Sequence, residues 1–95
     1  MDQDQRAPPP GAKRPTAKQI RDRLVQEVAG ATGIPAARVD VREPFASYGI
    51  GSIEAVQLVG VLEDWLGLTL DATLLWDHAT IEALARHLAT LVTAA

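Results

Sequence analysis

The sequence predicts an all-α fold, a small four-helix bundle with three main helices and one short helix. Apolar residues recur at helical spacing in three segments, and no segment shows the alternation that marks a β-strand. Glycine, proline and capping residues stand between these segments. A chain of 95 residues has room for one such domain with a small core.

Residues 1–15 are predicted to form a disordered tail, and residues 16–95 the folded domain. The tail holds three consecutive prolines, which a helix interior excludes, and no apolar run that could anchor it to a core. The start at Met1 and the end soon after the last helix favour a discrete protein, although an excised domain with an added start would look the same.

The first main helix is predicted after Thr16, which can serve as its N-cap. Four apolar residues at helical spacing form its core-facing stripe: Ile20, Leu24, Val28 and Ala31. Gly30 and Gly33, followed by Pro35, are expected to end this helix.

A long loop is predicted between the first two helices, over residues 34–51. Two prolines and two glycines interrupt this stretch, and its apolar residues follow neither the helical nor the strand period. Five of them are expected to hold the loop against the helices: Ile34, Val39, Val41, Phe45 and Ile50. Long ordered loops in small domains are often functional.

The second helix is predicted over residues 52–66 and is apolar on more than one face. One stripe consists of Val56, Val59, Leu62 and Leu66, and a further set consists of Ile53, Leu58, Val61 and Trp65. A helix with this much apolar surface is either central in the fold or presents a face to partners. For Ile53 and Val56, core packing and partner contact both remain open.

The last part of the chain is predicted to hold the short helix and the third main helix. Gly67 is expected to end the second helix, and Asp71 to cap one short turn that ends near Trp76. Thr80 is expected to cap the last helix, and Glu82 falls in its first turn, where a negative charge suits the helix dipole. The apolar stripe of this helix is Ile81, Leu84, Ala85, Leu88 and Leu91.

Charge is unevenly distributed along the chain. Residues 1–42 hold eight of the nine Lys and Arg, whereas residues 43–82 hold seven Asp and Glu and no Lys or Arg. An acidic surface repels nucleic acid and attracts basic protein patches, although it can also simply keep a protein soluble. Trp65 and Trp76 lack the interleaved basic residues of a nucleic-acid stacking platform, so we expect them in the core or at a partner-facing surface. The absence of cysteine, of a signal peptide and of a membrane-length apolar run predicts a cytoplasmic protein without membrane contact.

No catalytic residue and no metal site is assigned from the sequence. The chain lacks the GxxxxGK[ST], GxGxxG and HExxH motifs, and no GxSxG surrounds Ser52. A hydrolytic triad of Ser52 with Asp77 and one of the two histidines is disfavoured, because Asp77 and His78 are sequence neighbours that rarely face each other. His87 is expected to be solvated on the last helix, and His78 to close a turn.

Ser52 is one of only two serines and stands at the predicted start of the second helix. It can act as an N-cap, but capping-box spacing fits Gly51 better, because Glu54 stands three residues after it. The serine hydroxyl would then lie beside unpaired backbone N–H groups and the positive end of the helix dipole, where a phosphate is favoured. A capping serine and an attachment point both remain open.

The stretch FASYGIGSIEAVQLVGVLEDWLG, followed by LTLDATLLWDHATIEALARHLA, resembles the acyl carrier proteins, most closely those of modular polyketide synthases. The usual pattern is a loop ending Leu-Gly-x-Asp-Ser-Leu, an apolar-acidic helix and a Phe-Asp-x-Pro-Thr turn. The resemblance covers residues 17–92. Tyr48 replaces the common leucine, Gly51 the aspartate before the modified serine, and Ala79 the proline of the turn. The missing aspartate puts in question how readily a generic transferase would modify the chain.

The resemblance implies a non-catalytic, monomeric carrier that holds acyl intermediates as thioesters on a 4′-phosphopantetheine arm at Ser52, with Gly51 beside the arm. The implied partners are a phosphopantetheinyl transferase, a loading enzyme (an acyltransferase or an adenylate-forming ligase) and a ketosynthase or other acyl-processing enzyme of polyketide biosynthesis. The expected partner contacts on the second helix are Ile53, Glu54, Val56, Gly60, Glu63 and Asp64. A peptidyl carrier and an unmodified helical protein-binding adaptor remain as alternatives.

Overall fold

The computed structural model describes residues 15–94 and shows an all-helical bundle. Its elements are α1 (Ala17–Thr32), α2 (Ser52–Leu66), the short α3 (Leu74–Asp77) and α4 (Ile81–Ala94), with the 3-10 helices η2 (Ala36–Arg38) and η3 (Phe45–Tyr48) between α1 and α2. The predicted fold of three main helices and one short helix is therefore confirmed. The predicted tail, residues 1–15, lies outside the described residues except for its last position.

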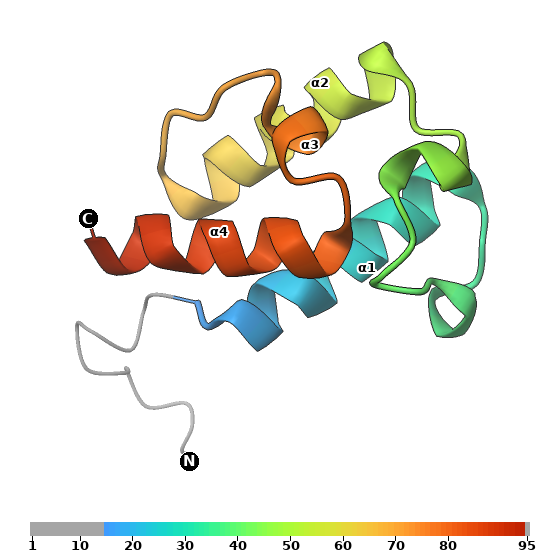
Figure 1. The fold of residues 1–95 in the computed structure, drawn as a ribbon, viewed down its shortest axis with the longest axis horizontal. Helices are drawn as coiled ribbons and strands as arrows, with labels where there is room; N and C mark the ends of the chain where they lie inside the picture. The colour runs from blue at the N-terminus through green and yellow to red at the C-terminus, as the bar shows by residue number, and fades with distance from the viewer. Residues whose placement is uncertain (1–14, 95) are drawn as a thin grey trace.

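The helix α4 crosses the middle of the bundle, with α2 and α3 above it, and α1 runs from below α4 obliquely past its N-terminal end (Figure 1). The closest pairing of helices is that of α1 with α4. The core is formed by the buried side chains that these helices and the loop turn inward, among them Ile20, Leu24, Val28, Phe45, Leu58, Leu62, Leu84 and Leu88. None of the helices within the described residues is long and apolar enough to cross a membrane.

Capping residues set the ends of α1. The Thr16 hydroxyl accepts a hydrogen bond from the Gln19 N–H at 3.1 Å, and the Gln19 side chain accepts one from the Thr16 N–H at 2.8 Å. This capping box starts the helix as predicted. The helix runs past Gly30 and ends at Gly33, whose φ of 78° favours glycine. Ala31 is exposed, so its predicted place on the core stripe is wrong; it borders an open groove between α1 and α2.

The long loop is confirmed, with two 3-10 turns that the irregular apolar spacing did not predict. Phe45 and Ile50 are buried, Val39 and Val41 pack against the core, and Ile34 is only half-buried. Two backbone hydrogen bonds fasten this loop to the start of α4, from Phe45 N to Ala79 O at 2.8 Å and from Glu82 N to Val41 O at 3.0 Å. The segment that leads to α2 is therefore held in place at several points.

The connection around α3 differs in detail from the prediction. Thr73, not Asp71, occupies the N-cap position of α3, whereas the helix ends at Asp77, next to Trp76 as predicted. The Asp71 carboxylate instead accepts hydrogen bonds from the backbone N–H and the hydroxyl of Thr73, each at 2.9 Å, which forms a turn ahead of the helix. The hydroxyl of Thr80 accepts from the Ala83 N–H at 3.1 Å, so the predicted cap of α4 is confirmed.

Candidate attachment site and docking face

Ser52 is the first residue of α2, and its side chain is exposed. The N-cap position belongs to Gly51, and Glu54 Oε1 accepts a hydrogen bond from the Gly51 N–H at 3.0 Å. Glycine has no side chain to supply the second half of a capping box. The expectation that Gly51 rather than Ser52 stands at the cap is confirmed, so the Ser52 hydroxyl is not used to cap α2.

The start of α2 offers several donors to an anion attached at Ser52. The first backbone hydrogen bond of the helix runs from Ala55 N to Gly51 O at 2.9 Å, which leaves the N–H groups of Ser52, Ile53 and Glu54 ahead of it. Within residues 15–94, the Ser52 hydroxyl has no hydrogen-bond partner. Free N–H groups at the positive end of a helix dipole suit a phosphate, so the local donors fit a phosphodiester on this serine.

The absence of a side chain at Gly51 has a local consequence for Glu54. A Cβ at position 51 would lie 3.3 Å from Glu54 Oε1, the oxygen that receives the Gly51 hydrogen bond. That is a tight contact with the end of a flexible side chain. Glycine therefore gives the Glu54 carboxylate room to close over the start of the helix, although it removes the aspartate that is usual in carrier proteins.

Tyr48, another residue that departs from the usual carrier pattern, fixes the loop ahead of the serine. Its hydroxyl accepts a hydrogen bond from the Asp40 N–H at 2.6 Å and donates one to the Asp40 carbonyl at 2.7 Å. Gly49 then turns the chain with a φ of 77°, and Ile50 is buried in the core. The backbone is thus anchored up to two residues before Ser52.

Two apolar side chains of α2 are open to solvent beside the candidate site. Ile53 is 72% exposed and Val56 57% exposed. The open question between core and partner contact is therefore decided against the core for both residues. The small residue Ala55 packs inward instead, next to Leu58 in the helical register.

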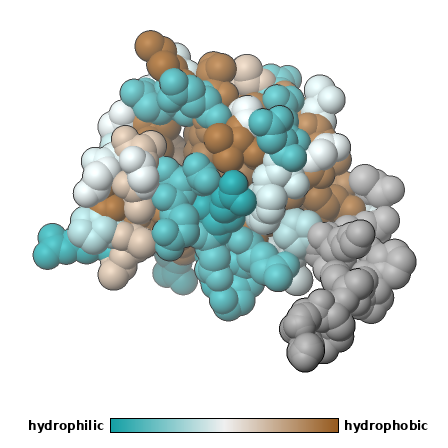
Figure 2. Space-filling view, turned by 180° about the vertical axis from the view of Figure 1, so that it is seen from behind, coloured by the Kyte–Doolittle hydropathy of each residue, from teal (hydrophilic) through white to brown (hydrophobic). Residues whose placement is uncertain are grey.

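Trp76 of α3 is a third large apolar side chain on the surface, with 53% of its area exposed. Of the two expected locations for this residue, the structure supports the surface. Trp65 is half-buried and packs against the core. Seen from behind, the surface also has hydrophobic areas (brown) between hydrophilic ones (teal) (Figure 2). Because Trp76 lies in α3, it was not among the partner contacts expected on the second helix.

The acidic and small residues expected to contact partners have different surroundings. One carboxylate oxygen of Glu63 accepts a hydrogen bond from the Leu70 N–H at 2.8 Å, so this half-buried side chain ties down the segment after α2. Asp64 is exposed and forms no ion pair within the described residues. Gly60 is half-buried, and a Cβ placed there would meet no other atom within 4 Å.

The two histidines stack on each other, with ring centroids 3.9 Å apart and planes inclined by 15°. His87 is therefore half-buried, because His78, at the end of α3, stacks on one face of its ring, and the prediction of a solvated His87 holds only in part. Burial lowers the pKa of His87, and the charge of His78 lowers it further, whereas Asp77 acts in the opposite direction. In the described part of the chain, neither ring bonds to Ser52, and no three His, Asp or Glu residues are grouped to hold a metal ion.

The position of Ser52 at the start of α2 agrees with a family assignment made from the sequence. Residues 22–88 match the family model described as "Phosphopantetheine attachment site". The chain belongs to this family. The cofactor of the family is 4′-phosphopantetheine, attached covalently, and the resemblance to phosphopantetheine-dependent carriers is confirmed.

Individual relatives are carrier proteins or contain a similar segment. NorB of the spectinabilin polyketide synthase system of Streptomyces orinoci is 41% identical over 76 residues, which cover 79% of this chain but only 3% of NorB. A free-standing peptidyl carrier protein from Acinetobacter baumannii is 35% identical, with a TM-score of 0.78 over 81% of this chain and 96% of that one.

A second solved structure is also similar. Asl1650 of Anabaena sp. PCC 7120, an acyl carrier protein with a variant phosphopantetheinylation-site sequence, is 31% identical. Its TM-score is 0.76, over 81% of this chain and 88% of that one. Together with the helical fold, these similarities identify the chain as a carrier domain.

Proposed function

We propose that Ser52 carries the 4′-phosphopantetheine arm and that the chain tethers acyl intermediates on it as thioesters for polyketide-forming enzymes. The observation that carries the proposal is the exposed Ser52 hydroxyl at the start of α2. This hydroxyl does not cap the helix, because Gly51 occupies the N-cap position. The other serine, Ser47, lies within the short η3 and not at the start of a main helix. Modification would form a bond between Ser52 Oγ and the phosphate of the arm and break the pyrophosphate bond of coenzyme A, which releases 3′,5′-adenosine bisphosphate and the hydroxyl proton.

The residues around the arm would bind and orient it rather than catalyse a reaction. The N–H groups at the start of α2 would hold the phosphodiester, and the thiol at the end of the arm would carry the acyl group. Cysteine is absent from the sequence, so no side-chain thiol competes for that acyl group. Tethering keeps the acyl group at a high effective concentration near each enzyme, which supports a non-catalytic carrier role.

The exposed face of α2 is proposed to dock the enzymes in turn. Ile53 and Val56 would supply apolar contacts, while Glu54 and Asp64 would attract basic patches on a phosphopantetheinyl transferase, a loading enzyme and a ketosynthase. The polyketide synthase relative NorB supports acyl cargo. The similarity to a free-standing peptidyl carrier favours peptidyl cargo as the second candidate.

The attachment is tested by incubating the protein with coenzyme A and a broad-specificity phosphopantetheinyl transferase, followed by intact-mass measurement. The wild type and the matched control Ser47→Ala should both gain the mass of the arm, and Ser52→Ala should gain none. No gain with any transferase, or a gain in Ser52→Ala, would overturn the proposal. An unmodified native protein whose partner binding survives Ser52→Ala would instead be an adaptor, and the mass of the native loaded form would separate acyl from peptidyl cargo.

A further inference from the structure

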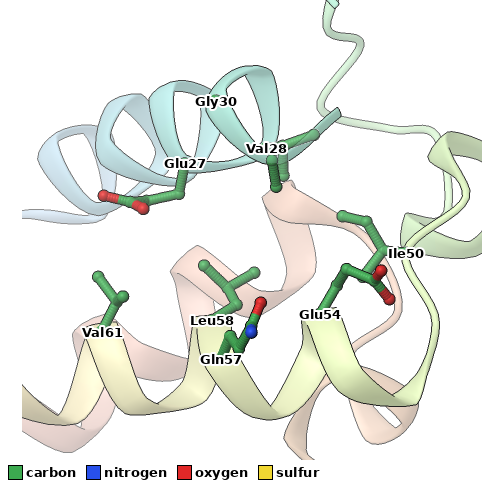
Figure 3. A pocket seen from close by; sticks show the side chains of 9 residues that line it. Glu27, Val28, Gly30, Ile50, Glu54, Gln57, Leu58 and Val61 are labelled. Atoms are coloured by element: carbon green, nitrogen blue, oxygen red, sulfur yellow. The ribbon is translucent and has the colours of Figure 1, made fainter. Parts of the chain in front are cut away.

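A groove of about 230 Å³ opens between α1 and α2 (Figure 3). Its floor consists of the buried apolar side chains of Val28, Ile50 and Leu58. Val61 extends this apolar surface along α2. The groove lies outside the face formed by Ile53 and Val56, neither of which lines it.

The groove exists because α1 packs closely along α4 and stands off from α2. Part of the wall on the α1 side is low, because Gly30 has no side chain and Ala31 has a small one. A Cβ added to Gly30 would meet no atom within 4 Å, so even this wall has space beyond it. The apolar floor and the low wall together leave room for an apolar side chain of another protein.

The rim of the groove is polar and carries negative charge. Glu27 and Glu54 lie toward its two ends, and Gln57 lies between them (Figure 3). The charge of Glu27 is met by Arg23, whose Nε lies 2.9 Å from Glu27 Oε2 and whose guanidinium lies 4.9 Å from the Trp65 ring centroid. Glu54 has no cationic partner within residues 15–94, because its bond goes to the neutral Gly51 N–H. The rim therefore has one carboxylate available to an incoming cation.

The helical register of α2 turns the proposed arm away from this groove. Ser52 shares a face with Val56 and Val59, four and seven residues later, whereas the groove is lined by Glu54, Leu58 and Val61 at the same spacing. The volume is also below the roughly 300–1,000 Å³ of pockets that enclose a drug-sized ligand. It suits a single large side chain better than a whole acyl chain.

We propose that the groove between α1 and α2 is a second docking site, for a basic amphipathic segment of a partner protein. One apolar side chain of that segment enters the groove over Val28 and Leu58, and a neighbouring Lys or Arg pairs with Glu54. A partner held there would leave the Ser52 side of α2 open. The inference rests on the fold and the charge of the groove, so it stands independently of modification at Ser52.

The test uses a short synthetic helical peptide of leucine and lysine as the probe, with leucine–glutamate and serine–lysine peptides as controls. Binding is measured by fluorescence anisotropy and mapped by amide chemical shifts of the isotope-labelled protein. Only the leucine–lysine peptide should bind, with shifts at Val28, Ile50, Leu58 and Val61. Ser52→Ala should bind it as the wild type does, which separates this result from the proposed carrier function.

Matched substitutions locate the contact. Ala31→Trp fills the groove and should weaken binding by about tenfold or more. Ala37→Trp places the same side chain on the exposed η2, away from the groove, and should leave the affinity within about twofold. Glu54→Gln keeps an oxygen for the Gly51 N–H but removes the charge, so it should weaken binding about threefold. Glu43→Gln removes an exposed charge away from the groove and should leave the affinity unchanged.

The proposal is overturned if the peptide shifts map to Ile53, Val56 and Trp76, or if Ala31→Trp binds as the wild type does. Groove shifts that appear on acyl loading without peptide would identify the carrier's own cargo as the occupant. Groove shifts that depend on protein concentration alone would identify a second copy. Either result would also overturn the proposal of a basic partner segment.

Discussion

The α1–α4 pair and the α2 helix use their apolar residues in opposite ways. In the pair, Ile20 and Leu24 of α1 and Leu84 and Leu88 of α4 are buried. On α2, Ile53 and Val56 remain largely in solvent, although the same helix also buries Ala55, Leu58, Val59 and Leu62. The first region holds the fold together, whereas the second keeps apolar area available for contacts outside the chain.

This difference follows from the composition of the helices. The apolar residues of α4 lie mainly on one side, so burying them leaves a polar outer surface. The helix α2 has apolar residues around most of its circumference, and one core can cover only part of them. A large exposed side chain forgoes about 1.5–3 kcal/mol that its burial would contribute. Retaining two such side chains next to Ser52 supports a docking role.

The largest expected effect is the loss of core packing between α1 and α4. Leu84→Ala removes a side chain with 0% exposure and should lower the free energy of unfolding by about 2–5 kcal/mol. Val56→Ala, on the exposed face of α2, should change it by less than about 0.5 kcal/mol. Urea unfolding followed by circular dichroism checks both variants. Similar losses in the two would show that the regions do not differ in their contribution to stability.

A smaller effect is expected at Gly60, in the interior of α2. Alanine at this position meets no other atom and favours the helix, so Gly60→Ala should raise the free energy of unfolding by up to about 1 kcal/mol. It should also weaken docking of the phosphopantetheinyl transferase, seen as a higher KM for the carrier with kcat unchanged. Thr90→Ala in α4, exposed and outside both proposed docking surfaces, is the control, because alanine should stabilise its helix without raising that KM. A lower stability of Gly60→Ala would contradict the space seen around this glycine.

The smallest expected effect is on the pH dependence of stability, through His87 of α4, which stacks on His78. Burial lowers the pKa of His87 below its ordinary value, with a further contribution from His78. The unfolded chain then binds this proton more readily, so the contribution to stability is present above the unfolded pKa of about 6.5 and is lost as pH falls from there through the lower pKa of the folded chain. Unfolding midpoints measured on both sides of this pH should show a smaller pH dependence in His87→Gln than in the wild type. Equal dependence in the two proteins would refute this account.

The sequence predicted the helices well where local chemistry determines them. Thr16 and Thr80 are caps whose hydrogen bonds involve residues three positions away, and the bounds of α2 follow from Gly51 and Gly67. Ser52 could be singled out because its position relative to Gly51 and Glu54 is also a local matter. In each case, the decisive partners lie within one helical turn.

Features that depend on distant residues were not predictable in the same way. Periodicity could not show that Ala55 rather than Val56 faces the core, because several registers of α2 offer an apolar stripe. The stacking of His78 on His87 joins residues nine positions apart through a turn. The groove between α1 and α2 requires small residues on one helix to meet apolar residues on another, which only the tertiary structure shows.

The position of Gly51 separates helix capping from cofactor attachment. Because the helix begins through the Gly51 N–H and the Glu54 carboxylate, a group added to Ser52 Oγ would break no bond that holds the fold. The bare, modified and loaded forms would then have the same backbone and nearly the same stability. Successive enzymes would then have to distinguish these forms by the group attached to Ser52, since the protein surface would be the same in all of them.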